Sequence, residues 1–238
     1  MKTCIIIPAR MDSTRLPGKP LLDICGKPMI RRVYEGACRT GFEVYLALCD
    51  RELAEAAESF GAPYIMTRRD HRSGTDRIAE AAEKLDCDTV INLQGDEPLV
   101  DPRDIRVLAD SLRDSDAEMA TLIVPISKAE AADPNLVKVV CDQKGNALYF
   151  SRSPIPYDRE PGAPYYGHIG IYAYRRSFLL KYPSMDRTPL ERSESLEQLR
   201  ALENGCRIRT LVVAEKPMGV DTPEDLERVR AIFEAADV

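Results

Sequence analysis

The sequence lacks the motifs that assign several common enzyme classes. It contains neither Gly-x-x-x-x-Gly-Lys-[Ser/Thr] nor Gly-x-Gly-x-x-Gly, so a P-loop ATPase and a classical dinucleotide-binding protein are both unsupported. Only two histidines occur, His71 and His168, and no serine or cysteine nucleophile motif accompanies them, which leaves no catalytic triad to assemble. An isolated histidine is more often a surface or packed residue than a catalytic one.

Cysteine pairs and long apolar runs are missing as well. The seven cysteines are scattered singly without a Cys-x-x-Cys pair, which indicates neither a zinc ribbon nor a redox motif and favours reduced, packed thiols. No apolar run approaches the ~20 residues that a membrane span needs, so we expect no membrane partner. The apolar stretch near the N-terminus is too short for the core of a signal peptide, and we therefore expect a cytoplasmic protein.

An overall excess of positive charge is also absent. The net charge of −6 argues against a nucleic-acid partner, because such binding needs an excess of lysine and arginine. It does not exclude a small anionic ligand, since the basic residues of 10–19 and 68–77 could form a local positive pocket. The composition, 44% hydrophobic and 30% charged, is that of an ordinary globular protein.

Strand and helix patterns alternate over the first half of the chain, which predicts an α/β fold with parallel strands. The expected strands are 3–8, 43–48, 64–66 and 89–93, and the expected helices are 28–41, 51–60, one starting near 78, and 102–112. After residue 118 strands dominate, at 119–126, 137–141, 147–150 and 169–174, followed by helices at 175–182 and 190–204, a strand at 207–213 and a helix at 223–235. We therefore expect one domain over 1–238, with a mixed, mainly parallel sheet and a β-rich lobe at about 118–175.

A basic loop follows the first expected strand. Arg10, Arg15 and Lys19 come directly after the apolar residues 3–8, and Gly18 precedes the lysine. Arginine offers a planar fork to phosphate, lysine offers a compact charge, and backbone amides near a glycine can approach an anion closely. The alternative is a solvated basic turn, but the order of strand, basic loop and helix favours a polyphosphate site.

Two acids stand in loops next to predicted elements. Asp96 follows the strand at 89–93, where a carboxylate would face the ligand crevice and could hold Mg²⁺, which takes one or two protein carboxylates and completes its shell with phosphates and water. Asp221 precedes the last helix. Asp96 could instead simply form a turn, and Asp221 could instead be a helix-capping partner.

Ligands of open α/β sheets bind at the carboxyl ends of the strands. The polar loops 9–19, 49–50, 67–77 and 94–98 all follow predicted strands at such ends. If these loops meet at one edge, they bring together Arg10, Arg15, Lys19, Ser73, Arg77, Gln94 and Asp96.

Several stretches resemble one family in particular. Ile-Pro-Ala-Arg at 7–10 and Ser-Thr-Arg-Leu-Pro-Gly-Lys-Pro at 13–20 are similar to the nucleotide-binding loop of sugar-acid cytidylyltransferases. The later stretches resemble the 3-deoxy-manno-octulosonate cytidylyltransferases, or CMP-Kdo synthetases, over nearly the whole chain. These stretches are 73–77 (Ser-Gly-Thr-Asp-Arg), 93–98 (Leu-Gln-Gly-Asp-Glu-Pro), 148–152 (Leu-Tyr-Phe-Ser-Arg), 168–172 (His-Ile-Gly-Ile-Tyr), 196–200 (Leu-Glu-Gln-Leu-Arg) and 219–226 (Gly-Val-Asp-Thr-Pro-Glu-Asp-Leu).

The resemblance implies a Rossmann-like, GT-A-like nucleotidyltransferase fold and a Mg²⁺-dependent transfer of CMP from CTP to Kdo, with release of pyrophosphate, for lipopolysaccharide synthesis. It implies a homodimer, and it implies roles for individual residues. Nucleotide contacts are implied for Arg10, Arg15, Lys19, Ser73, Arg77 and Gln94; catalysis for Lys19, Asp96 and Asp221, with the two acids binding the metal; and sugar contacts for Gln94, Arg152, His168, Tyr172, Glu197 and Gln198.

The acceptor stays open among related acids, such as 8-amino-Kdo or sialic acid, and a non-catalytic nucleotide-binding relative is the lesser alternative. Two departures from the family pattern stand out. The connection between Pro156 and His168 is short, which could alter how a sugar lobe closes. Leu48-Cys49-Asp50 replaces a common Ala-Thr-Asp, and we interpret this as a change in packing only.

Overall fold

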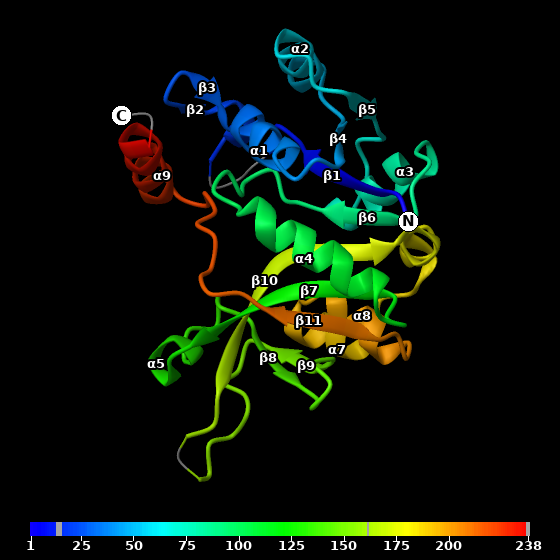
Figure 1. The fold of residues 1–238 in the computed structure, drawn as a ribbon, viewed down its shortest axis with the longest axis vertical. Coiled ribbons are helices and arrows are strands. Elements are labelled where there is room, and N and C mark those ends of the chain that lie inside the picture. The colour runs from blue at the N-terminus through cyan, green and yellow to red at the C-terminus, as the bar shows by residue number, and fades with distance from the viewer. Residues whose placement is uncertain (13–15, 161, 237–238) are drawn as a thin grey trace. The chain divides into compact units, whose positions relative to one another are not determined.

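The structure is a computed structural model that describes residues 1–12, 16–160 and 162–236 (Figure 1). Its contacts divide the chain into two compact units. Unit 1 comprises Met1–Arg106 and Pro217–Val238, and unit 2 comprises Val107–Lys216. That these units act as the single domain expected from the sequence stays a prediction.

The sheet of unit 1 is parallel and is built on the first strand. β1 (Thr3–Ala9) pairs with β6 (Thr89–Asn92) on one side and with β4 (Glu43–Leu48) on the other, and β5 (Tyr64–Met66) pairs with β4. Because β1 is central, the isoleucines at 5–7 are fully buried. Strands β1, β4 and β6 therefore begin in a buried apolar core, and the polar loops that follow them lie at the same edge of the sheet.

Helices and a small hairpin complete unit 1 (Figure 1). The helices are α1 (Met29–Cys38), α2 (Arg51–Ser59), α3 (Gly74–Glu83) and α9 (Pro223–Ala236), with the short turn η1 (Lys19–Leu21), and α4 (Pro102–Arg113) runs across the boundary into unit 2. The hairpin of β2 (Asp23–Ile24) and β3 (Lys27–Pro28) lies beside α9, whose Arg230 donates to the Asp23 carbonyl. The sequence did not predict this hairpin, because each strand has only two residues.

Unit 2 contains the β-rich part of the chain. β10 (Tyr165–Arg175) pairs antiparallel with β7 (Met119–Ile126) and with β8 (Lys138–Cys141). β8 pairs antiparallel with β9 (Ala147–Ser151), and β11 (Ile208–Val212) pairs parallel with β7. A mixed sheet with a mainly parallel part in unit 1 is thus confirmed.

The helices of unit 2 are shorter than the sequence predicts. They are α5 (Lys128–Ala131), α6 (Arg176–Leu179), η2 (Tyr182–Ser184), α7 (Pro189–Glu194) and α8 (Gln198–Glu203). The single helix expected at 190–204 is wrong, because Ser195 adopts a left-handed conformation, with φ of 53°, that ends α7. The helix expected at 175–182 ends early, at Leu179.

Within the residues described, no helix has both the length and the apolar character needed to cross a lipid bilayer.

Candidate active site

A cavity of about 380 Å³ opens in unit 1 at the carboxyl ends of its parallel strands. This volume falls within the range of small-molecule sites. Its lining includes nearly every residue that the sequence assigned to a nucleotide or metal: Arg10, Lys19, Ser73, Arg77, Gln94, Asp96 and Asp221. The predicted convergence is confirmed for these residues, whereas Arg15 lies outside the described part of the chain.

The loop after β1 is held at its start by the strand beside it. The backbone N–H of Met11 donates to Asp50 at 2.8 Å, and Arg69 forms an ion pair with the same carboxylate at 2.9 Å. Asp50 lies two residues after the end of β4 and is almost fully buried. Further along the loop, Gly18 adopts φ of 67° to start η1, a conformation that favours glycine. These contacts fix Arg10 and Lys19 at the edge of the cavity.

Three charged side chains meet in the cavity. The ammonium of Lys19 donates to Asp96 at 2.6 Å and to Asp221 at 3.2 Å. Asp96 and Asp221 come from distant parts of the chain, but the N–H of Val220 donates to the Asp96 carbonyl at 2.9 Å and joins the two loops. Because oxygens of both carboxylates lie within reach of one ammonium, the pair forms a site that already favours a cation.

The start of α3 supplies two further residues of the cavity. The hydroxyl of Ser73 accepts from the N–H of Asp76 at 3.2 Å and caps the helix. This cap starts α3 at Gly74, so the helix begins earlier than the sequence predicted. Arg77 is buried and donates to the Thr67 hydroxyl at 2.7 Å and to the Arg68 carbonyl at 3.3 Å. Part of its guanidinium therefore braces the loop before α3.

The loop after β6 approaches β1 closely. The side-chain amide of Gln94 donates to Asn92 at 3.0 Å, which fixes the orientation of the amide group and leaves its oxygen as the acceptor. A Cβ on Gly95 would lie 3.0 Å from the Pro8 carbonyl oxygen, which is backbone and cannot move aside easily. Glycine at this position therefore allows the Asp96 loop to pack against the end of β1.

Arg152, after β9 in unit 2, is held by main-chain acceptors. Its Nε donates to the Glu194 carbonyl at 2.8 Å and its Nη1 to the Pro134 carbonyl at 3.1 Å. The carboxylate of Glu194 accepts from the Arg152 N–H, and the buried ammonium of Lys138 donates to the Arg152 carbonyl at 2.6 Å. No described residue accepts a hydrogen bond from Nη2, so one edge of the guanidinium can still donate to a carboxylate.

His168 and Tyr172 form part of an aromatic row on β10. The ring centroids of these two residues are 5.4 Å apart, and Phe150 packs edge-on against His168 at 5.1 Å. Burial, together with the positive charge of Lys216, lowers the pKa of His168 to about 3. Burial and the nearby Tyr174 and Glu197 raise the pKa of Tyr172. Both side chains are therefore neutral at pH 7.

Glu197 and Gln198 follow the turn at Ser195. Gln198 starts α8 and is 5% exposed, yet no hydrogen-bond partner is found for its Nε2 among the described residues. Buried amide donors are nearly always paired, so an unpaired one calls for an explanation. A ligand whose oxygen accepts a hydrogen bond from this amide would explain it.

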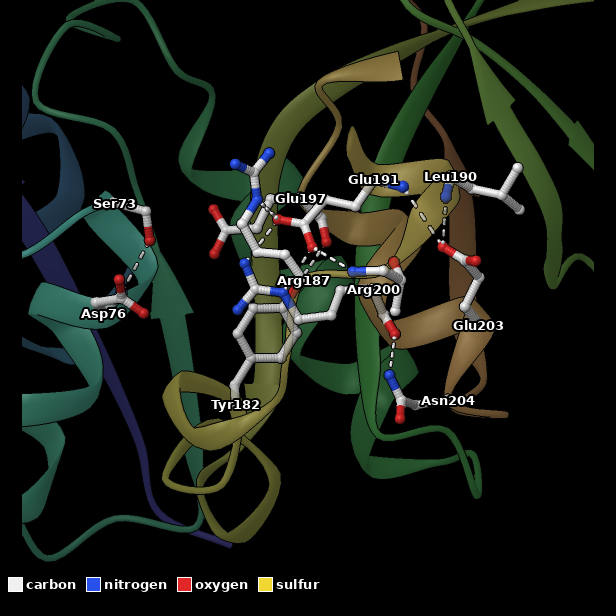
Figure 2. A network of polar contacts seen from close by, with 11 residues as sticks. Ser73, Asp76, Tyr182, Arg187, Leu190, Glu191, Glu197, Arg200, Glu203 and Asn204 are labelled. Atoms are coloured by element: carbon white, nitrogen blue, oxygen red, sulfur yellow. Dashed lines mark hydrogen bonds and ion pairs between the residues drawn. The ribbon is translucent and has the colours of Figure 1, made fainter. Parts of the chain in front are cut away.

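The segment that carries Glu197 is supported by a buried ion pair (Figure 2). Arg200 donates to both carboxylate oxygens of Glu191, at 2.7 and 2.9 Å, and its guanidinium lies 4.9 Å from the centre of the Tyr182 ring. The Tyr182 hydroxyl donates to the Glu197 carbonyl at 2.6 Å. Burial would raise the pKa of Glu191, but the hydrogen bonds from Arg200 and Arg187 hold it below its usual range.

Comparisons with known proteins bear directly on this arrangement. Residues 4–209 match the family model described as cytidylyltransferase. A 3-deoxy-manno-octulosonate cytidylyltransferase from Escherichia coli is 53% identical over 98% of this chain and 96% of its own length. The chain belongs to the 3-deoxy-manno-octulosonate cytidylyltransferase family. A relative from Solibacter usitatus with the same name is 50% identical over 97% of this chain and 94% of its own.

Solved structures agree with this cytidylyltransferase assignment. A CMP:2-keto-3-deoxy-manno-octonic acid synthetase complexed with CTP matches with a TM-score of 0.96 and 51% identity, over the whole of both chains. A cytidylyltransferase from Leptospira borgpetersenii matches with a TM-score of 0.67 over 99% of this chain and 87% of its own, at 21% identity, and so supports the fold alone. The Rossmann-like nucleotidyltransferase fold is thus confirmed.

The sequence missed three residues of this cytidylyltransferase site. Asp12 and His71 line the cavity, and Asp50 anchors the loop beside it. The sequence indicates only a surface or packed residue at His71, which the structure shows hydrogen-bonded to Glu80. The sequence places Asp50 after a predicted strand, which is the same signal that located Asp96. The departure from the family pattern at 48–50, however, was interpreted as a change in packing only.

Replacing Arg200 with Met should lower the free energy of unfolding by about 3 kcal/mol or more, because it leaves the Glu191 carboxylate buried without its main partner. Chemical denaturation followed by circular dichroism measures this change. Arg113→Ala is the control, since Arg113 pairs with Asp110 on an exposed helix face, and its midpoint should stay close to that of the unsubstituted protein. Equal shifts for the two variants would contradict a structural role for the buried pair.

Proposed function

We propose that the chain transfers CMP from CTP to 3-deoxy-D-manno-octulosonate (Kdo) with the help of Mg²⁺, forming CMP-Kdo for lipopolysaccharide synthesis. The observation that carries the proposal is the Lys19 ammonium shared by Asp96 and Asp221. Support for the two substrates comes from the relative's name, which specifies 3-deoxy-manno-octulosonate, and from the neighbour's structure, which contains CTP.

The residues of the cavity fit a magnesium ion. Asp96 and Asp221 provide the oxygen ligands that Mg²⁺ prefers, and their carboxylates already share one positive charge. Among the described residues, no group of three or more His, Cys, Asp or Glu side chains could hold a metal. This suits Mg²⁺, which needs only one or two protein carboxylates and takes its other ligands from phosphate and water. When bound, the ion would neutralise phosphate charge and lower the pKa of the attacking hydroxyl.

The basic residues of the cavity bind and orient the triphosphate. Arg10 and Lys19 supply positive charge at the edge of the cavity, and we propose the same role for Arg15. Lys19 would leave the two carboxylates when a metal takes its place, and would then donate to the phosphates. Its charge stabilises the pyrophosphate as negative charge grows on it during the reaction.

The sugar acid is recognised by residues of unit 2. The free edge of Arg152 pairs with the sugar carboxylate, and the unpaired amide of Gln198 donates to a sugar oxygen. We assign the remaining sugar contacts to His168, Tyr172, Glu197 and Gln94, and we assign Gln94 to the nucleotide as well. Fixed positions for these donors and acceptors lower the entropic cost of bringing two substrates together.

The reaction is a substitution at phosphorus. The anomeric hydroxyl oxygen of Kdo forms a bond to the α-phosphorus of CTP as the bond from that phosphorus to the β-bridging oxygen breaks. Pyrophosphate leaves with the electron pair, and the hydroxyl proton passes to solvent. Such chemistry needs positioning and charge neutralisation rather than a covalent nucleophile, which agrees with the lack of a triad.

Pyrophosphate release from CTP and Mg²⁺, measured with Kdo, 8-amino-Kdo and sialic acid in parallel, tests the proposal. We expect release with Kdo at a clearly higher kcat/KM than with the other acids. Preference for 8-amino-Kdo would reassign the acceptor, and no release with any acid would favour a non-catalytic nucleotide-binding role. A homodimer remains a proposal from the family resemblance, and a cytoplasmic location remains a proposal from the sequence.

A further inference from the structure

A β-bulge interrupts β10 between the two aromatic residues assigned to the sugar. Ile169 lies opposite Leu122 of β7, but Tyr172 lies opposite Thr121, so β10 carries two additional residues at this point. A bulge takes backbone groups out of the regular hydrogen-bonding ladder. The Thr121 hydroxyl lies 3.0 Å from the Ile169 carbonyl oxygen and 2.9 Å from that of Ile171, within hydrogen-bonding distance of both groups. Thr121 itself is fully buried.

The same hydroxyl has a third contact, with Nε2 of His168 at 3.0 Å. A hydroxyl has one proton to donate, and a carbonyl oxygen can only accept. The single proton of Thr121 can be donated to the carbonyl of Ile169 or to that of Ile171, and neither carbonyl can donate in return. When the proton is donated to a carbonyl, the contact with His168 is a hydrogen bond only if the imidazole donates it, which places the ring proton on Nε2.

The neutral state of His168 leaves its other ring nitrogen as an acceptor. Burial and the charge of Lys216 keep the ring unprotonated over the physiological range. Phe150 and Tyr172 pack against the ring, and neither can transfer a proton to it at neutral pH. No described residue donates a hydrogen bond to Nδ1. A hydroxyl group is the kind of ligand that this nitrogen would bind.

We infer that Thr121 is a positioning residue that holds His168 as the Nε2–H tautomer, so that Nδ1 accepts a hydrogen bond from a hydroxyl of the sugar acid. The inference rests on the proposed function, because that function assigns His168 to the sugar. It adds a buried strand residue, whose hydroxyl never meets the substrate, to the determinants of acceptor recognition.

The tautomer can be measured directly, because the chain has only two histidines. Nitrogen-15 NMR of ring-labelled protein separates protonated from unprotonated ring nitrogens, and the spectrum of His168→Gln assigns the signals. We expect His168 in the unsubstituted protein to show a protonated Nε2 and an unprotonated Nδ1. The opposite tautomer would overturn the inference without any variant of Thr121.

Two variants test the role of the hydroxyl. Thr121→Val keeps the shape of the side chain but removes the hydroxyl that donates and accepts. We expect His168 in this variant to populate both tautomers, and the KM for Kdo to rise about 10-fold while the KM for CTP stays unchanged. Thr121→Ser keeps the hydroxyl and should retain both the tautomer and the KM. A structural role alone would lower the melting temperature of Thr121→Val without changing the tautomer or the KM for Kdo, and that result would overturn the inference.

Failure of the inference and failure of the proposed function give different results. If the protein uses Kdo but His168 carries its proton on Nδ1, the inference is wrong and the function stands. If the Nε2–H tautomer is found but no sugar acid supports pyrophosphate release, the proposed function and the hydroxyl contact are both overturned.

Discussion

Replacing Asp96 with Asn lowers turnover by ~10²-fold or more, because the substitution removes one of two carboxylates proposed to hold the metal at the reacting centre. The amide has the same size as the carboxylate, so packing of the loop after β6 is retained. Lys19 then keeps only Asp221 as a charged partner in the cavity. Pyrophosphate release at saturating CTP, Kdo and Mg²⁺ measures the effect.

Asp101→Asn is the matched control for this substitution. Asp101 also pairs with a cation, Arg103, and lies a few residues further along the same loop, but it does not line the cavity. Its turnover should equal that of the unsubstituted protein. A readout independent of activity is the binding of Mn²⁺ in the presence of CTP, followed by electron paramagnetic resonance, which should weaken in Asp96→Asn alone. Full turnover in Asp96→Asn would rule out the metal assignment.

The sequence predicted the unit 1 site well because one rule of sheet geometry governs it. Strands β1 and β6 run parallel, so the loops that follow them open at the same edge and bring Lys19 and Asp96 together. Asp221 joins them through the Val220 backbone, a contact that no local pattern encodes. The assignment of Asp221 to the site therefore came from the family resemblance and not from periodicity.

The features that the sequence missed depend on contacts between distant segments. The role of Asp50 depends on the N–H of Met11, which is 39 positions away in the sequence. The helix break at Ser195 occurs where the sequence has no glycine or proline, the residues that usually indicate a break. Residues 190–204 contain no glycine or proline, so the sequence favoured one long helix. Ser195 adopts a left-handed conformation, which is costly for residues other than glycine.

Replacing Arg152 should have the second large effect, and the effect should be confined to the use of the sugar acid. Its Nε and Nη1 are occupied by the carbonyls of Glu194 and Pro134, so the guanidinium is fixed before any ligand arrives. Because little side-chain entropy is lost on binding, a carboxylate at its free edge gains most of the energy of a charged, forked hydrogen-bond pair. Lys138 lies fully buried beside the Arg152 backbone and adds a second positive charge, and burial lowers the pKa of this lysine.

Arg152→Ala should therefore lower kcat/KM for Kdo by ~10²–10³-fold, the loss expected when one partner of a desolvated charge pair is removed. Affinity for CTP, measured by isothermal titration calorimetry, should not change, because none of the residues lining the unit 1 cavity is altered. Arg152→Lys keeps the charge without the fork and should recover only part of the loss. Arg159→Ala removes an exposed arginine from the same connection and serves as the control. An equal loss of CTP affinity in Arg152→Ala would contradict the assignment, since it would place the guanidinium on the nucleotide and leave the sugar carboxylate without its proposed partner.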